Sequence, residues 1–405
     1  MRLILTLTAF LVFFIFAESK LTLPLRRHEG LKNKLIREGK WEEYQKRISK
    51  SSSKGVSEVA QLYDYFNDFF SHTVQIGTPP QTLILRPDTS SSDLWFMDKN
   101  KCTADQCKGF PSLTSNFNRS LFDSTKSSTY AMVKSGFMSG VCLNGSLGSD
   151  MFTMAGFPSI TQQFGLCFDV DKFMGLHPFD GYLGLAWPAL STSGATPVVQ
   201  NMISTSTFDK PVFSVYLLND NKGAITYGRN TAGSITYGGL DSYNCDSNIS
   251  YVPLSSRTYW QFTMGSFNFG NLTINKNQQV IVSTAEAIII LPDNVYNQII
   301  AQINVTYFPL VDGAKYLVKC SQAPSFPSLR FTIGANTYVI PGPGYIDQLP
   351  TPPDTCALRI ETPEGFGFGP SWILGAPFYR TYCVHHDVGN GQIGFSAQTP
   401  KSMVI

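Results

Sequence analysis

The sequence predicts a mainly β protein built from two related lobes. Its 405 residues exceed what one compact core accommodates and suit a pair of domains. From Gln61 onward, short runs rich in β-branched and aromatic residues alternate with Gly, Pro, Asn and Ser, the pattern of strands joined by tight turns. A coarse internal repeat supports two lobes, because each half pairs an apolar strand entering a Thr-containing turn with a later apolar Leu-Gly element.

The expected strands recur through most of the chain. Alternation within them places apolar residues on one face, as in sandwiches and barrels. They are HTVQIGTPPQTLIL (72–85), GSITYGG (233–239), ISYVPL (249–254), YWQFTMGSFNFG (259–270) and LRFTIGANTYVIPG (329–342). Helical periodicity occurs only in short pieces such as PVVQNMI (197–203) and PDNVYNQIIAQI (292–303).

Residues 1–19 are expected to be a signal peptide. Arg2 precedes an apolar run from Leu3 to Phe16, and Ala17 is a small residue suited to cleavage. The run is shorter than the roughly 20 residues that a membrane-spanning helix needs, and no later stretch reaches that length. We therefore expect a soluble mature protein with no membrane span, either secreted to the extracellular space or carried to lysosomes by the secretory pathway.

Residues 20–60 are expected to be a basic pro-segment. Residues 20–54 carry a net charge of +7, whereas residues 55–405 carry −5, which argues against nucleic acid as a partner. A solvated helical arm is the alternative for the basic stretch, because LKNKLIREGKWEEYQKRI (31–48) has mixed charge and scattered apolar positions. The rest divides into an N-terminal lobe, 61–205, and a C-terminal lobe, 206–405.

Eight cysteines and five Asn-x-Ser/Thr acceptors suit an oxidising secretory route, and several acceptors are expected to be glycosylated. The acceptors are Asn118, Asn144, Asn248, Asn271 and Asn304. Cys102 and Cys107 close a small loop if they pair with each other. The even number among Cys142, Cys167, Cys245 and Cys383 favours two more disulfides, of which sequence alone permits three connectivities.

Cys383, His385 and His386 lie close enough in sequence to suggest a metal cluster. On a strand, however, His385 and His386 point to opposite faces, so they do not converge on one ion. We expect no metal and no organic cofactor.

Eight segments, in order, resemble the landmarks of pepsin-like aspartic peptidases, over a region running from about Tyr63 to Ala397. They are GTPPQ (77–81), DTSSSDLW (88–95), the Cys102–Cys107 loop, FDGYLGLAWP (179–188), SGATPVVQNMI (193–203), FSVYL (213–217), YWQFTM (259–264) and WILGAPF (372–378). The resemblance implies an all-β, bilobal pepsin-like acid protease fold, with two β-barrel-like lobes around a central cleft. It also implies a peptide or protein ligand in that cleft, a monomer, and a disulfide between Cys320 and Cys356.

The family's chemistry needs two aspartates, one in an Asp-Thr-Gly turn of each lobe. One carboxylate accepts a proton from a water while the other donates a proton to the peptide carbonyl. The first turn keeps the catalytic acid, Asp88, the Thr that ties the two turns together, Thr89, and the hydroxyl three places on, Ser91. Its Gly has become Ser90.

The second turn departs from the family at its centre. Ser283 stands where the second catalytic Asp is expected, Thr284 is kept, Ala285 replaces the Gly, and Glu286 replaces the usual Ser or Thr. A serine hydroxyl is too weak an acid to hold the shared proton and too weak a base to activate water. Asp293, ten places on, is the partner only if this alignment is wrong.

The segment that covers the cleft also departs from the family. Where relatives carry Tyr-Gly, this chain has SGFMSGVC (135–142), and Phe137 is the best match for the tyrosine. Together with the residues flanking the catalytic positions of both turns, Phe137 is expected to line the substrate site. That set is Thr89, Ser90, Ser91, Phe137, Thr284 and Ala285.

Two functions are compatible with these residues. The first is a proteolytically inactive or crippled peptidase homologue that retains a peptide-binding cleft. The alternative is an atypical aspartic-type endopeptidase that works at acidic pH and uses Asp88 with Glu286 as a substitute acid.

Overall fold

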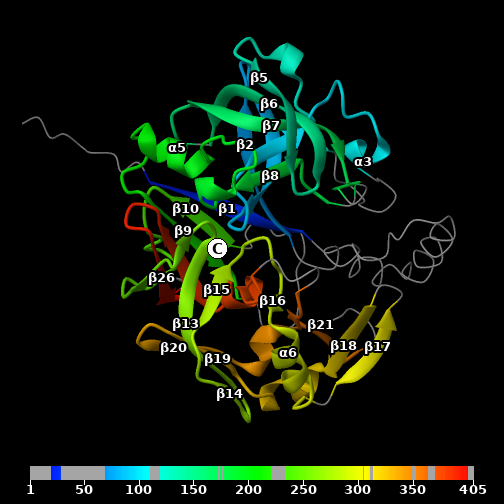
Figure 1. Ribbon diagram of the computed structural model, residues 1–405, viewed down its shortest axis with the longest axis vertical. Coiled ribbons are helices and arrows are strands. Elements are labelled where there is room, and N and C mark those ends of the chain that lie inside the picture. Colours follow the sequence, from blue (N-terminus) through cyan, green and yellow to red (C-terminus); the bar gives the residue numbers. More distant parts are fainter. Residues whose placement is uncertain are drawn as a thin grey trace, which may run out of the picture.

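The computed structural model describes residues 20–28, 69–109, 119–154, 156–171, 174–175, 177–219, 233–303, 305–310, 313–348, 353–363 and 370–399. Within these ranges the chain forms three β sheets and a few short helices. Figure 1 shows two lobes, one with β5, β6 and β7 at the top and one with β17 to β21 at the bottom, and strands between them. The expected all-β, bilobal fold is confirmed.

The largest sheet has thirteen strands and runs from one lobe into the other. From edge to edge the strands are β11 (Ser250–Pro253), β26 (Gln392–Ala397), β25 (Tyr382–Asp387), β9 (Val212–Leu217), β10 (Gly233–Tyr237), β1 (Leu21–His28), β2 (Phe69–Ile76), β3 (Gln81–Asp88), β8 (Gly181–Gly184), β4 (Leu94–Met97), β7 (Ile160–Val170), β6 (Cys142–Thr153) and β5 (Ala131–Ser139).

The other two sheets belong to the second lobe. One contains, in order, β20 (Asn336–Ile340), β19 (Leu329–Ile333), β13 (Trp260–Phe269), β15 (Gln278–Val282), β24 (Ile373–Leu374), β16 (Ile289–Ile290) and β23 (Ile360–Glu361), with β12 (Ser256–Arg257) and β14 (Leu272–Ile274) paired to β13. The smaller contains β17 (Thr306–Leu310), β18 (Gly313–Lys319), β22 (Thr355–Leu358) and β21 (Ile346–Gln348).

Helices are short, and both pieces with helical periodicity form them. The α-helices are α3 (Asp105–Lys108), α5 (Val198–Ser204), α6 (Asp293–Ile300) and α7 (Ala376–Tyr379), and the 3-10 turns are η2 (Ser124–Lys126), η4 (Pro188–Leu190), η5 (Cys320–Ser325) and η6 (Gly342–Tyr345). Val295 and Ile299 of α6 are buried one turn apart, which explains the periodicity. The same α6 contains Asp293, so that aspartate does not stand in the second turn.

The N-terminal segment is part of the main sheet. Leu21 to Leu25 of β1 pair with β10, and residues 26–28 pair with β2. Leu23 and Leu25 are buried there. The first residues of the expected pro-segment are therefore a central strand; the expected signal peptide, 1–19, and residues 29–60, including the proposed helical arm, lie outside the described residues.

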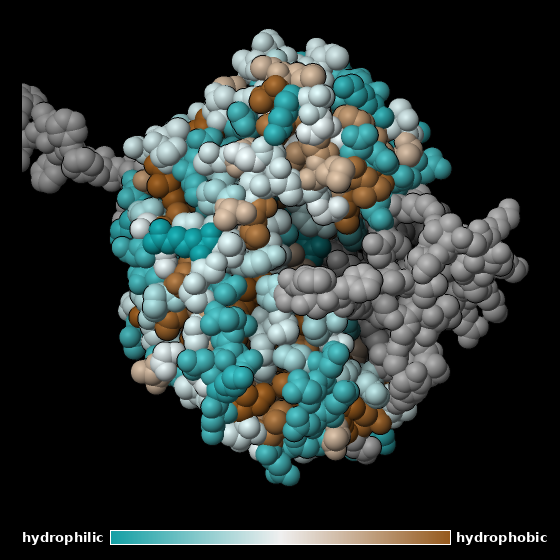
Figure 2. Space-filling view, viewed as in Figure 1, coloured by the Kyte–Doolittle hydropathy of each residue, from teal (hydrophilic) through white to brown (hydrophobic). Residues whose placement is uncertain are grey.

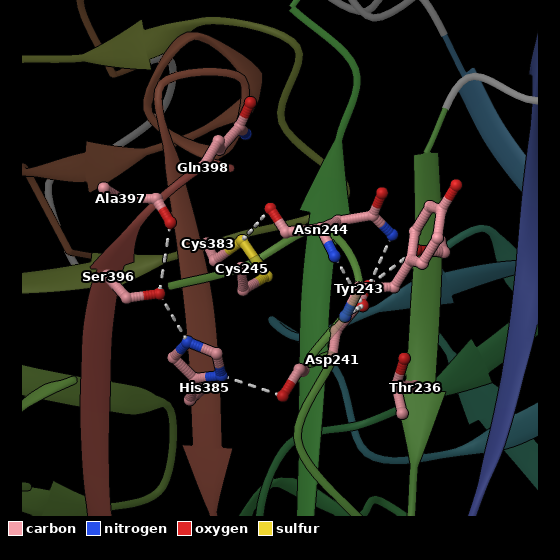
Figure 3. The surroundings of a disulfide bond; sticks show 12 residues. Thr236, Asp241, Tyr243, Asn244, Cys245, Cys383, His385, Ser396, Ala397 and Gln398 are labelled. Carbon is pink, nitrogen blue, oxygen red and sulfur yellow. Dashed lines mark hydrogen bonds between the residues drawn. A yellow bond between two sulfur atoms is a disulfide. The ribbon is translucent and has the colours of Figure 1, made fainter. Parts of the chain in front are cut away.

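Four disulfides are present in the structure. Two are the expected pairs, Cys102–Cys107 and Cys320–Cys356. The other four cysteines pair as Cys142–Cys167 and Cys245–Cys383, which settles the connectivity that the sequence left open. Cys245–Cys383 joins strand β25 to the loop before β11 (Figure 3).

The adjacent histidines of β25, His385 and His386, are buried and contact residues of neighbouring strands. One ring nitrogen of His385 lies 2.8 Å from the Ser214 hydroxyl. The other lies 3.0 Å from the Ser396 hydroxyl, and Figure 3 shows these two side chains together. His386 stacks on Phe213 at a ring distance of 4.3 Å. The two rings have separate sets of partners, as the expected opposite orientations require. Across the described part of the chain, no cluster of three or more His, Cys, Asp or Glu side chains has the arrangement of a metal site.

Burial keeps these histidines neutral. It lowers the pKa of His72 to about 4 and that of His385 to about 4, the latter against the opposing effect of Asp241. Burial also holds the pKa values of His177 and His386 well below the ordinary value, and the nearby Arg86 and Arg119 guanidinium groups add to the effect at His177. The folded state therefore resists protonation at these positions.

We expect the free energy of unfolding to fall as the pH is lowered from 7 to 5. Histidines of the unfolded chain take up a proton near pH 6.5, whereas folded His72 and His385 do so only near pH 4. The contribution of the two neutral histidines to the free energy of unfolding is complete above pH 6.5 and is lost progressively toward pH 4. At pH 5 the loss is about 2 kcal/mol for each histidine. Urea titrations at both pH values measure it. His72→Gln should show a shallower dependence, and an unchanged dependence would contradict the assignment.

Candidate active site

The first turn is held at the end of a buried strand. Asp88 is the last residue of β3, which pairs in parallel with β8 so that Asp88 lies opposite Gly184. A Cβ on Gly184 would lie 2.3 Å from the Ser92 carbonyl carbon, so only glycine allows this approach. Asp88 is 6% exposed. The strand and the Leu-Gly element therefore position the first turn together.

The second turn is built in the same way. Ser283 follows β15, which pairs in parallel with β24, and its N–H donates to the Leu374 carbonyl at 3.2 Å. A Cβ on Gly375 would lie 2.1 Å from the Ile288 carbonyl oxygen. The coarse repeat in the sequence thus corresponds to one parallel strand pair in each lobe.

Reciprocal hydrogen bonds between Thr89 and Thr284, here called the threonine grip, join the two turns. The Thr89 N–H donates to Thr284 Oγ1 at 3.1 Å, and the Thr284 N–H donates to Thr89 Oγ1 at 3.0 Å. Thr284 Oγ1 in turn donates to the Pro87 carbonyl at 2.9 Å. Both threonines are buried, so these bonds hold the two lobes together at the site.

The Asp88 carboxylate is surrounded by hydroxyl and amide donors from its own turn. Oδ1 accepts the Ser90 N–H at 2.7 Å and the Ser90 hydroxyl at 2.5 Å, and Oδ2 accepts the Ser91 hydroxyl at 2.7 Å. Hydrogen bonds to an ionised carboxylate are among the stronger ones in proteins. Both oxygens of the Asp88 side chain therefore have donors within the turn itself.

Ser283 is linked to Asp88 through Ser90. The Ser283 hydroxyl donates to Ser90 Oγ at 3.2 Å, and the Ala285 N–H donates to the Ser283 hydroxyl oxygen at 3.2 Å. The result is a directed chain from the Ala285 amide through Ser283 and Ser90 to the carboxylate of Asp88. A single negative group ends this chain.

Glu286 is half-buried beside the second turn. Its carbonyl oxygen accepts the Ala376 N–H at 2.8 Å. Among the described residues, the side chains bonded to the Asp88 carboxylate are those of Ser90 and Ser91, and Glu286 is not one of them.

Arg86 is a site residue that sequence reasoning missed. Two places before Asp88, its guanidinium lies 5.7 Å from the ring centres of Phe179 and Tyr182 and donates to the Ala285 carbonyl of the second turn. It is 3% exposed. A charged residue inside the apolar run LILRPD was the available signal.

Aromatic side chains connect the turns to the segment expected to cover the cleft. Trp95 stacks on Tyr182 at 5.1 Å, and Phe137 of β5 belongs to the same buried cluster as Trp95 and Phe179. A Cβ on Gly165 would lie 2.1 Å from the Phe137 ring, so the ring packs directly against Gly165 of β7. Phe137 therefore packs in the same cluster as Phe179 and Tyr182, the two rings next to the Arg86 guanidinium.

Tyr379 lies next to Thr89, one of the two residues of the threonine grip. Its hydroxyl is 3.5 Å from Thr89 Oγ1 and 3.4 Å from His386 Nε2. Burial raises its pKa far above the ordinary value, and the negative charge of Asp88 adds to the increase. Tyr379 therefore remains a neutral phenol in contact with Thr89.

The family model of the eukaryotic aspartyl proteases matches residues 69–398. The chain belongs to that family. Aspartic protease 1 of Caenorhabditis elegans is 36% identical over 94% of this chain and 95% of its own length. Aspartic protease 17 of the same organism is 37% identical over 92% and 94%, respectively. Pepsin A of Gallus gallus is 31% identical over 92% of this chain and 98% of its own length.

Asp88 and Ser283 occupy matching places in two strand-and-turn arrangements, because each stands at the end of a strand that pairs in parallel with a Leu-Gly element. No helix within the described ranges has the length and apolar character needed to cross a membrane.

Thr284→Val should destabilise the aspartyl protease fold. Valine keeps the shape but removes the oxygen that serves the Thr89 N–H and the Pro87 carbonyl. Each buried backbone group left without a partner costs about 1–3 kcal/mol. Urea unfolding measures the change. Thr337→Val is the matched control, because the Thr337 hydroxyl pairs with Thr332 at an exposed site; an equal effect of both substitutions would reject the role of the grip.

Proposed function

We propose that this chain is a secreted pepsin-like aspartic peptidase homologue whose cleft binds extended polypeptides without hydrolysing them. The observation that carries the proposal is the hydroxyl chain from Ser283 through Ser90 to Asp88. Where the family's chemistry uses two carboxylates, this hydrogen-bonded chain has one carboxylate and two alcohols.

The missing acid removes one half of the proton transfer. Hydrolysis requires one group to take a proton from water and another to give a proton to the peptide carbonyl. Such groups typically contribute roughly 10²–10⁴-fold each, so the loss of one corresponds to about 3–5 kcal/mol of transition-state stabilisation. A serine hydroxyl supplies neither function near neutral pH.

The remaining acid is also engaged. Asp88 accepts hydrogen bonds from the Ser90 amide and hydroxyl and from the Ser91 hydroxyl. These donors occupy both carboxylate oxygens, so a water that approaches Asp88 must compete with them. Ser90 Oγ also stands between Asp88 and Ser283, in the space where a water bridging both positions would sit.

Peptide binding depends on different features of the site. The aromatic cluster of Trp95, Phe137 and Tyr182 and the bonds of Thr89 and Thr284 support the site from inside the lobes and need no second acid. Extended peptides are bound through apolar contacts and backbone hydrogen bonds, which an inactive site can retain. These features support the proposal that the site still binds polypeptide.

We also propose passage through the secretory pathway, as an extracellular or lysosomal protein. The proposal is supported by four disulfides and by the exposure of Asn144, Asn248 and Asn271, which suits glycosylation. Asn118 and Asn304 lie outside the described residues.

Purified protein should not cleave an unfolded polypeptide. We expect reduced, carboxymethylated ribonuclease A to remain intact at pH values from 3 to 7, while it binds to the immobilised chain. Cleavage that is lost in both Asp88→Asn and Glu286→Gln would reject this function and support the alternative acid endopeptidase. Cleavage lost in Asp88→Asn alone would also reject it.

The position of Ser90 gives a second arm to this test. Ser283→Asp alone should stay inactive because Ser90 Oγ still bonds Asp88 Oδ1. The double variant Ser90→Gly with Ser283→Asp should gain at least about 10²-fold in cleavage rate over the wild type, in line with the contribution of one acid-base group. Equal activity of the single and double variants would show that Ser90 does not matter.

A further inference from the structure

Exposed apolar side chains gather on the hairpin formed by β5 and β6, residues 131–153. Here called the hairpin patch, they are Met132, Val133, Met138 and Leu143, with exposed fractions of 60%, 45%, 65% and 46%. The other large apolar side chains that the described residues expose are Tyr243 and Tyr251, whose hydroxyls suit contact with water. Figure 2 shows hydrophobic residues on the surface of the upper lobe, to which β5 and β6 belong.

The hairpin patch lies at an edge of the thirteen-stranded sheet, because β5 is the last strand of that sheet. Natural proteins protect such edges with charges, with bulges or with a covering element, since an open edge pairs readily with another chain. Apolar surface at the same edge adds to the tendency to associate. A group that covers the hairpin patch would therefore keep the protein apart from its own copies.

A β-bulge brings one polar side chain of β6 beside the patch. The two strands pair on either side of the bulge as Phe137 with Gly145 and as Ser139 with Cys142. Met138 of β5 therefore lies opposite two residues of β6, Leu143 and Asn144. Residues that face each other across two strands have Cβ atoms about 5 Å apart. A group attached to Asn144 thus starts next to the most exposed member of the patch.

Asn144 begins the triplet Asn-Gly-Ser, which is an acceptor for N-linked carbohydrate. Asn144 itself is exposed, whereas the third residue of the triplet, Ser146, is 5% exposed. Ser146 is paired on both sides, with Ser135 of β5 and with Leu166 of β7. An enzyme that reads the whole triplet reaches Ser146 only before these strands pair. Modification of Asn144 therefore precedes the folding of this lobe.

We propose that Asn144 carries an N-linked glycan whose first sugars lie on Met138 and Leu143 and shield the hairpin patch. The inference rests on the proposed passage through the secretory pathway. The donor is an oligosaccharide linked to a lipid diphosphate. Asn144 Nδ2 forms a bond to the anomeric carbon of the first sugar, the bond from that carbon to the diphosphate oxygen breaks, and the amide gives up one proton.

The chemistry of a sugar ring suits this place. Its C–H groups form an apolar face that packs on the side chains of Met138 and Leu143, and its hydroxyl groups face water. A branched glycan beside β5 also obstructs the approach of a second edge strand. One covalent group thereby protects both the apolar side chains and the open edge.

Asn271 is the matched control within the same chain. It lies in the two-residue turn between β13 and β14, whose flanking residues Phe269 and Leu272 pair with each other. Asn271 and Thr273, the third residue of its triplet, are both exposed. The exposed large apolar side chains of the described residues all lie in other segments. Loss of this acceptor removes a glycan without changing the hairpin patch.

The test uses the wild type, N144Q and N271Q, each secreted from cultured insect cells. Peptide mass before and after treatment with peptide N-glycosidase gives the occupancy of each acceptor. Oxidation of Met138 by dilute hydrogen peroxide reports shielding, because exposed methionines oxidise faster. We expect Asn144 to be occupied, and Met138 to oxidise about threefold faster or more in N144Q than in the wild type and N271Q.

Light scattering measures the consequence for association. We expect the wild type and N271Q to be monomeric, N144Q to associate, and N144Q/M138S/L143S to be monomeric again. A wild type that forms dimers with its glycan in place, and loses them in M138S/L143S, would identify a second copy as the occupant and overturn the inference.

The other outcomes separate the inference from the proposal on which it rests. Occupied Asn271 with unmodified Asn144 would reject the glycan at the hairpin alone, whereas two unmodified acceptors would reject passage through the secretory pathway as well. Equal oxidation of Met138 in the wild type and N144Q would show that the glycan does not lie on the patch. If N144Q is not secreted, Met138 is compared before and after peptide N-glycosidase treatment of the folded wild type; faster oxidation after treatment supports the inference and an unchanged rate overturns it.

Discussion

The reciprocal hydrogen bonds of Thr89 and Thr284 set the geometry on which the rest of the site depends. Each bond joins a backbone N–H of one turn to a side-chain oxygen of the other, so neither turn satisfies its buried groups alone. These two bonds fix the distance between the two turns where the lobes meet. Tyr379 beneath Thr89 and Arg86 beside Ala285 add contacts between the same segments.

With the turns at a fixed separation, the chemistry depends on which atoms they present. Serine is shorter than aspartate, so position 283 leaves space in front of Asp88, and the hydroxyl of Ser90 uses that space. The two departures from the family are thus complementary in shape and in hydrogen bonding. Two carboxylates in contact repel each other unless they share a proton. A neutral hydroxyl bridge between Asp88 and position 283 removes this repulsion.

Local pattern predicted most of the fold. The strands from His72 to Leu85 and from Leu329 to Ile340 and the helices at Val198 and Asp293 follow from periodicity and turn residues, and the opposite orientation of His385 and His386 follows from strand geometry. Other features depend on partners far away in sequence. The pairing of Cys142 with Cys167, the place of β1 beside β10, the Arg86 contact with Ala285 and the bridge through Ser90 arise from long-range register, which composition and spacing do not encode.

Binding without turnover places different demands on a cleft than catalysis does. An enzyme gains rate only from contacts that strengthen in the transition state, whereas a binding protein gains from contacts made equally well with the ground state. A disulfide between β6 and β7 and a hydrogen-bonded Asp88 both lower the reorganisation that a ligand must induce, which favours affinity. The same rigidity opposes the proton movements at Asp88 that hydrolysis requires. Under the proposed function, Ser283 in the second turn and the Cys142–Cys167 disulfide favour the same outcome, a site that holds an extended chain and leaves it intact.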